Sequence, residues 1–437
     1  MRKFLYSVLM LAAVVLAACS NDDNGDTQPK RGMILNASVE DLSSRATMTD
    51  ESGTWKFAFT QNDKVSVSNN KISSCYTFTN NGNQFTCAQA EVTKEDADWY
   101  AYFPGNEVDL TNQTGDFADV ANKFAVAGVT AEATTGEKGL SITLKSKVAV
   151  LRVVAVDKNG ILDIHVKTAD GKWVKGLTAT KNAADFTVST SDTKTTLLHK
   201  AAGEVQAGEI NYVVVPAGEK IAIYNGDLLL NTTKTGLTEG KYYTITSGPT
   251  KGTETATLSN GTTEQVEWVQ LWAGGPRFAT KNVEKEMTWT EAAKTGSDYV
   301  WGANWRTPTA EEVTEEGGLQ AKWVVDKVTK KGEWVVPEGS PTVNVTMKDG
   351  KEETVVFTGV QPGYTKNTLT LYNKIEYGYS HFNFWTTTEN NGYGCMYRIM
   401  IDKGIIGIFG PSSFESKDTK CYVRPVLSIQ NITNNPK

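Results

Sequence analysis

Histidine, cysteine and helical apolar periodicity are all scarce in this chain of 437 residues. The three histidines, His165, His199 and His381, lack the spacing of a metal site. No nucleophile elbow, phosphate loop or zinc-protease motif occurs either. We therefore expect no catalytic residues, no metal, no cofactor and no enzymatic activity. Carboxylate pairs that no motif marks leave a glycan-active enzyme as the alternative.

Positive charge and long apolar runs are also limited. The chain carries 44 Lys+Arg against 50 Asp+Glu, a formal net charge of −6. A weakly acidic chain is a poor candidate for a nucleic acid partner, so we expect none. After the apolar run Phe4 to Ala18, no second run approaches the roughly 20 residues that a bilayer span requires.

The first apolar run belongs to an export signal. Two basic residues precede it, and Leu16-Ala17-Ala18 then leads into Cys19, a pattern that resembles a bacterial lipobox. Residues 1–18 are accordingly a signal peptide, Cys19 carries lipid (palmitate), and residues 19–33 form a polar tether. Several acyl chains, at about 0.8 kcal/mol per buried methylene, give a stable anchor. We expect an outer-membrane lipoprotein, with an ordinary signal peptide as the alternative.

Residues 34–247 have the pattern of short strands separated by turns. Val65 to Ser68 alternates between apolar and polar residues, and Val148 to Val156 is a longer apolar run. Asn225-Gly226 between two apolar segments is a strong hairpin signal. About 200 residues of this kind predict two successive β-sandwiches, 34–138 and 139–247.

The remainder of the chain differs in composition. Small polar residues over 248–265 indicate a linker, and eight of the eleven tryptophans lie between Trp268 and Trp385. Two capping boxes, Thr288 with Glu291 and Thr309 with Glu312, predict helix starts. We therefore predict that residues 266–437 are an α+β domain and that the chain as a whole is mainly β.

Four cysteines follow Cys19, an even number that suits disulfides in an exported protein. A three-residue loop over residues 80–82, with glycine in the left-handed position, places Cys75 opposite Cys87 in a hairpin. Cys395 and Cys421 flank the last two strand-like segments. We predict the disulfides Cys75–Cys87 and Cys395–Cys421, with buried thiols as the alternative.

Several segments of residues 19–247 form a recognisable series. Ser44-Arg45-Ala46-Thr47 precedes Trp55, and Asp63 to Val67, Trp99 to Pro104 and Glu239 to Thr244 follow. With the lipobox, this series resembles the fimbrillin families of Bacteroidales, whose members build pili from exported lipoproteins. The resemblance implies two transthyretin-like sandwiches and, as partners, other fimbrial subunits joined by strand addition. In some members a trypsin-like protease cuts after an arginine near the N-terminus and frees a groove for a neighbour's strand. That cut corresponds to Arg45 and Ala46 here, and an exposed loop arginine is the alternative.

A second series runs through residues 266–428. It comprises Trp301 to Thr309 with Glu311-Glu312, then Gln361 to Tyr364, Phe384 to Glu389 and Val423 to Val426. The series resembles the fibrobacter-type major paralogous domain of the C-type-lectin-like superfamily. We expect Trp305, Trp385 and Arg424 to hold this fold rather than to touch a ligand.

The resemblance does not extend to calcium-dependent sugar binding. In lectins of that superfamily the proline of the calcium loop is followed by a residue with a side-chain oxygen, whereas Gln361-Pro362 is followed by Gly363, which has none. The superfamily also includes formylglycine-generating enzymes that use a cysteine pair. In an exported protein we expect Cys395 and Cys421 to form a disulfide instead.

These patterns together predict a cell-surface lipoprotein, a fimbrial subunit at the tip of a pilus or an adhesin, which displays a lectin-like domain. Its expected partners are fimbrial subunits and a glycan or protein of another surface, with the lipid as its only membrane contact. The alternative is a lipoprotein that captures or processes surface glycans, with the sandwiches as spacers. A structural envelope protein without a ligand is a third possibility.

Overall fold

The structure is a computed structural model of the chain. It describes residues 33–39, 59–69, 75–82, 84–87, 98–130, 139–158, 160–258, 260–314, 318–319, 322–325, 332–335, 340–348, 351–361, 364–372, 374–376, 379–402 and 405–428.

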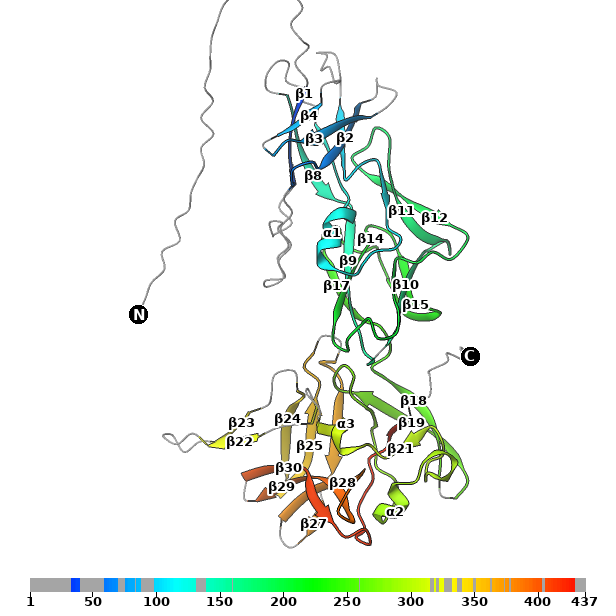
Figure 1. The fold of residues 1–437 in the computed structure, drawn as a ribbon, viewed down its shortest axis with the longest axis vertical. Coiled ribbons are helices and arrows are strands. Elements are labelled where there is room, and N and C mark those ends of the chain that lie inside the picture. The colour runs from blue at the N-terminus through cyan, green and yellow to red at the C-terminus, as the bar shows by residue number, and fades with distance from the viewer. Residues whose placement is uncertain are drawn as a thin grey trace, which may run out of the picture.

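Three β-rich parts follow one another along the long axis of the molecule (Figure 1). The prediction of a mainly β chain is confirmed, because strands dominate all three parts and the described helices are few and short. No helix in the described ranges has both the length and the apolar character that a membrane crossing requires.

The first part is a closed barrel, with strands in the order β1-β4-β3-β2-β5-β7-β8. Its strands are β1 (Met33–Val39), β2 (Lys64–Asn69), β3 (Tyr76–Asn80), β4 (Phe85–Cys87), β5 (Trp99–Phe103), β7 (Val126–Thr130) and β8 (Leu140–Ser146). The alternation of β8, in which every second residue is buried, gives the barrel an apolar interior. β1 pairs with both β4 and β8, so the predicted sandwich closes on itself and has no free edge.

The second part, the middle sandwich, packs two sheets. One follows the order β12-β11-β10-β15-β16, with β13 on β10 and β6 on β11, and the other is β14-β9-β17. The members are β6 (Glu107–Asp109), α1 (Phe117–Lys123), β9 (Val148–Val154), β10 (Leu162–Thr168), β11 (Trp173–Ala179), β12 (Phe186–Ser191), β13 (Leu198–Lys200), β14 (Ile210–Pro216), β15 (Ile221–Asn225), β16 (Leu228–Thr232) and β17 (Tyr242–Thr246). As predicted, the apolar run of β9 is a central, buried strand, and Gly226 (φ 58°) turns the β15–β16 hairpin.

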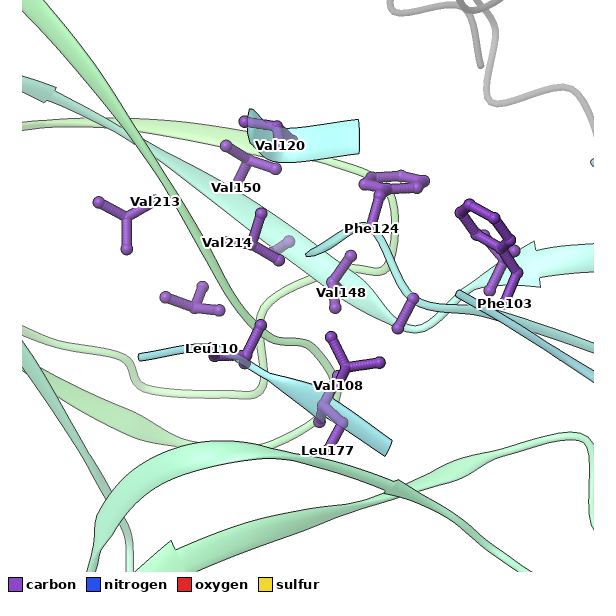
Figure 2. Packing of buried hydrophobic residues seen from close by; sticks show 14 of the residues in the cluster. Phe103, Val108, Leu110, Val120, Phe124, Val148, Val150, Leu177, Val213 and Val214 are labelled. Carbon is purple, nitrogen blue, oxygen red and sulfur yellow. The ribbon is translucent and has the colours of Figure 1, made fainter. Parts of the chain in front are cut away.

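The boundary predicted at residues 138 and 139 is wrong. β8 belongs to the barrel, and only Lys147 separates it from β9 of the middle sandwich. The chain also passes from the barrel strand β5 to β6, which pairs with β11 of the middle sandwich. One continuous apolar core results, in which Phe103 lies near Val108, Phe124 and Val148 (Figure 2). The chain crosses between the two parts several times, so a single cut in the sequence cannot separate them.

The third part, the C-terminal domain, begins earlier than predicted. Its first sheet has the order β18-β19-β20-β31-β21, with β18 (Lys251–Thr257), β19 (Thr263–Gln270), β20 (Arg277–Ala279), β21 (Trp305–Arg306) and β31 (Val426–Leu427). Residues 248–265 are therefore not a linker, because β18 pairs with β19 along its whole length. The threonines that suggested a linker also favour strands. Gly252 leaves room for the ring of Trp268, which lies opposite it.

The C-terminal domain also contains short helices, as the capping boxes predict. Both boxes are present: Thr288 accepts from the Glu291 amide before α2 (Trp289–Ala292), and Thr309 accepts from the Glu312 amide before α3 (Ala310–Thr314). The remaining elements are η1 (Gly296–Asp298), β22 (Lys322–Val325), β23 (Gly332–Val335), β24 (Thr342–Lys348), β25 (Lys351–Thr358), β26 (Thr368–Tyr372), β27 (Lys374–Glu376), β28 (Tyr379–Asn390), β29 (Tyr393–Asp402) and β30 (Ile405–Glu415).

Direct bonds join the C-terminal domain to the middle sandwich. Arg277 Nη2 lies 2.8 Å from Asp157 Oδ1, and the Gly274 amide donates to Val156 O at 2.7 Å. The side chain of Gln270 donates to the same carbonyl at 3.2 Å. One ion pair and hydrogen bonds from both main-chain and side-chain atoms therefore connect the C-terminal domain to the middle sandwich.

Candidate functional site

The first described strand, β1, holds the barrel closed. Ile34 and Leu35 pair with Thr86 and Phe85 of β4 in antiparallel fashion. On the other side, the residues from Leu35 to Val39 pair with Leu140 to Leu144 of β8 in parallel. One strand therefore satisfies the main-chain groups of two neighbours that would otherwise be sheet edges.

Side chains of β1 alternate across the barrel wall. Leu35 is fully buried, Ala37 and Val39 pack partly buried against the core, and Asn36 and Ser38 point outward. Burial of one leucine side chain contributes about 1.5–3 kcal/mol. Every second side chain of β1 thus packs into the apolar interior of the barrel.

The chain connects β1 to the rest of the barrel through residues 40–58. Arg45 and Ala46, the predicted processing site, fall in this connection, which lies outside the described residues. A cut after Arg45 leaves β1 attached by pairing and packing alone. The predicted lipidation site, Cys19, also lies outside the described residues, upstream of β1. The pairing of β1 with β8 was not apparent in the sequence, because the two strands are about a hundred residues apart.

The predicted opposition of Cys75 and Cys87 is wrong. The observed register pairs Thr79 with Thr86, so Cys87 lies opposite Phe78, three residues from Cys75. Gly82 does adopt the left-handed conformation (φ 98°), but the loop spans the four residues 81–84 rather than three. At about 3.3 Å per strand residue, the offset is about 10 Å, beyond the reach of a disulfide.

Cys395 and Cys421 lie in the C-terminal domain, and both are buried. The Cys421 thiol contacts the sulfur of Met396 at 3.9 Å, and Met396 is the chain neighbour of Cys395. Burial raises the pKa of the Cys395 thiol, which disfavours the thiolate that a nucleophile requires. No disulfide is formed among the cysteines of the described residues, and the pairing Cys395–Cys421 stays a prediction.

Three side chains expected to hold the fold of the C-terminal domain do so. Trp305, Trp385 and Arg424 are each fully buried. The two indoles donate to the carbonyls of Thr255 and Met287, both at 2.9 Å. The guanidinium of Arg424 donates to two further backbone carbonyls, Ala279 O at 3.0 Å and Thr370 O at 2.9 Å. Gln361 is likewise structural, because its side-chain oxygen accepts from the Ala273 amide at 3.0 Å.

Two histidines that are far apart in the sequence meet on one carboxylate of the middle sandwich. His165 Nε2 lies 2.9 Å from one oxygen of Asp163, and His199 Nδ1 lies 3.4 Å from the other. Burial opposes ionisation of Asp163, but hydrogen bonds from both imidazoles outweigh it and hold its pKa below the usual value. The pairing of β10 with β13 places Asp163 opposite His199, and the spacing of these residues in the sequence does not reveal this register. Among the described residues no group of three or more candidate ligands is placed to hold a metal.

Comparison with known proteins gives similarity to solved structures only; no protein-family model and no curated protein matches the sequence. A "putative cell adhesion protein" from Bacteroides uniformis is 13% identical, covers 54% of this chain and 97% of its own, and has a TM-score of 0.29. One from Bacteroides ovatus is 8% identical, with coverage of 55% and 96% and a TM-score of 0.32. A fimbrial protein from Bacteroides ovatus is 13% identical, with coverage of 92% and 100% and a TM-score of 0.25. At these scores the likeness decides neither fold nor function, which we argue from the chain's own residues.

Proposed function

We propose that this protein is a cell-surface fimbrial subunit whose barrel accepts a strand from a neighbouring subunit. The observation that carries the proposal is the position of β1 between β4 and β8, upstream of Arg45. Cleavage after Arg45 turns an integral strand into a dissociable one. Its departure leaves two unpaired edges and an apolar groove, the two features that strand addition uses for affinity and specificity.

The C-terminal end supports a tip position in the polymer. A shaft subunit needs a free strand to donate to its neighbour. Here the last strand of the middle sandwich, β17, is already paired in parallel with β9. Only residues 247–250 separate it from β18 of the C-terminal domain. A subunit that accepts a strand but offers none ends the polymer, with the C-terminal domain outermost as its binding surface.

The lipid at Cys19 belongs to the precursor. It holds the exported chain on the outer membrane, and the cut after Arg45 releases the barrel from the lipid. Loss of palmitate labelling in Cys19→Ala tests this anchor, and unchanged labelling contradicts it.

The groove can be tested with a peptide of the β1 sequence, Met33 to Val39. The purified chain without its signal peptide is cut by an arginine-specific protease, and N-terminal sequencing locates the new end. A fluorescent peptide should then bind the cut barrel and exchange with β1. The uncut chain and Arg45→Ala should bind at least tenfold less, because their strand remains covalently attached.

A control peptide in which Leu35 is replaced by aspartate should not bind, because it puts a carboxylate where a fully buried leucine lies. Equal binding to cut and uncut chain, or no binding to either, contradicts the strand-acceptor proposal. A new N-terminus other than Ala46 contradicts the assignment of the processing site.

A further inference from the structure

A hollow of about 400 Å³ opens on the C-terminal domain, where β18 and β19 meet the start of β26. Its volume is within the range of small-ligand sites. None of the residues that line it belongs to the motifs that suggested the lectin-like resemblance. Its lining combines apolar surface with polar residues, among them Thr253, Thr280 and Thr368.

One wall of the hollow is the edge of an indole ring. Trp268 lies between two small residues on neighbouring strands, Gly252 and Ala279. A Cβ on Gly252 would lie 3.1 Å from the indole nitrogen, so the absence of a side chain there allows the ring to pack directly against β18 in the wall of the hollow.

The indole N–H of Trp268 is available to a ligand. Four other tryptophans of the domain, Trp289, Trp301, Trp305 and Trp385, donate theirs to protein oxygens. Within the described ranges no protein group accepts from Trp268, and its nitrogen is not among the buried unpaired atoms. The nitrogen is therefore not completely enclosed, although Trp268 as a whole is only 5% exposed, and the residue lines the hollow.

Two lysines line the same hollow. The side-chain amide of Asn367 donates to Thr250 O at 3.3 Å and to Gln270 O at 2.8 Å. These bonds hold together the backbone segments that carry Lys366 and Lys251. Both lysines are exposed, and neither forms an ion pair with a described residue. The lining contains one carboxylate, Glu267, so the hollow is net positive on a chain of net charge −6.

We infer that this hollow binds a saccharide that carries a carboxylate, such as a uronic acid. The two lysines match the carboxylate, and charge-assisted hydrogen bonds are the stronger kind. The indole N–H donates to a ring or hydroxyl oxygen, and the three threonines exchange hydrogen bonds with sugar hydroxyls. The inference gives a ligand class to the domain proposed above as the outermost binding surface, and in that respect it rests on the proposed function.

The test uses the full exported chain and three probes: digalacturonate, neutral digalactose and a hexaglutamate peptide. Titration calorimetry should detect binding of digalacturonate and not of digalactose. The double variant Lys251→Ala/Lys366→Ala should weaken binding about tenfold or more, the scale for the loss of hydrogen bonds to a charged group. The matched control, Lys294→Ala/Lys420→Ala, removes two exposed lysines of the same domain and should leave binding unchanged.

Because all four lysines are exposed, every variant should keep the parent's thermal unfolding midpoint. Absence of digalacturonate binding overturns the inference, as does equal weakening in the control pair. Binding of hexaglutamate as tight as that of digalacturonate identifies an acidic-peptide site and also overturns it. Retention of a different, neutral glycan by the parent chain leaves the proposed adhesin role standing while this assignment fails.

Discussion

A partly buried ion pair stabilises the start of α3 in the C-terminal domain. Glu312 caps α3 through the Thr309 amide and forms a two-point ion pair with Arg306, in which Nη1 lies 2.7 Å from Oε2. Burial opposes ionisation of Glu312, but the Arg306 guanidinium and the Thr309 amide outweigh it and hold its pKa below the ordinary value of 4.5. The folded state therefore prefers the ionised carboxylate.

We predict that Glu312→Gln destabilises the domain by about 1–2 kcal/mol at pH 7, because a charge-assisted pair is lost. A carboxyl group whose pKa is lower in the folded than in the unfolded protein stabilises the fold at pH values above its unfolded pKa. This stabilisation is lost as the pH falls through its folded pKa. The difference between parent and variant should therefore shrink below about pH 4.5. Urea unfolding at pH 7, 5 and 3.5 measures it, and Glu311→Gln, an exposed neighbour, is the control. A difference that does not shrink between pH 5 and pH 3.5 contradicts this role.

At the scale of elements, turn length decides which residues face each other. The β3–β4 hairpin needs four loop residues, and this shifts Cys87 to face Phe78 and the core. Cys75, three positions away from Phe78, is half-buried and on the other side of the strand.

We predict that Cys75 and Cys87 are thiols that react at different rates in the native protein. Iodoacetamide without reductant should modify Cys75 at least tenfold faster than Cys87, because only Cys75 is partly exposed. Peptide mapping by mass spectrometry reads both sites, and denatured protein, in which the rates should converge, is the control. A non-reduced Cys75–Cys87 peptide would show that the observed register is wrong.

For the whole molecule, the three parts form a continuous chain of contacts. The three parts follow one another along the molecule (Figure 1). A shared core joins the barrel to the middle sandwich, and the Arg277–Asp157 pair lies at the joint with the C-terminal domain. β1 lies in the barrel and the hollow in the C-terminal domain, so the proposed polymer contact and the proposed ligand contact would use different domains.

We predict that an antibody against residues 266–437 marks one end of each intact fibre in immunogold microscopy. The physical reason is that β17 is committed to its own sandwich and cannot serve as a donor strand. An antibody against a shaft subunit, which should label at intervals, is the control. Regular labelling of the shaft by the first antibody contradicts the tip position.

The sequence by itself determined the features that depend on near neighbours in the chain. The buried run of β9, the Asn225-Gly226 turn and both capping boxes follow from local residue chemistry, and the structure confirms them. The alternation predicted for Val65 to Ser68 is not seen, because all four residues of this stretch of β2 are buried. The mainly β class followed from the same local patterns. The expectation that Trp305, Trp385 and Arg424 hold the fold agrees with their complete burial.

Only the tertiary structure decided which distant segments pair. It placed β1 between β4 and β8, joined the first two predicted domains in one core, and made strands of the predicted linker. It also brought two histidines to Asp163 and assembled the hollow from four separate segments. Apart from the β18–β19 hairpin, these arrangements depend on a strand register between segments that are tens of residues or more apart in the sequence. Because a shift of one residue reverses every side chain, no local pattern specifies such a register.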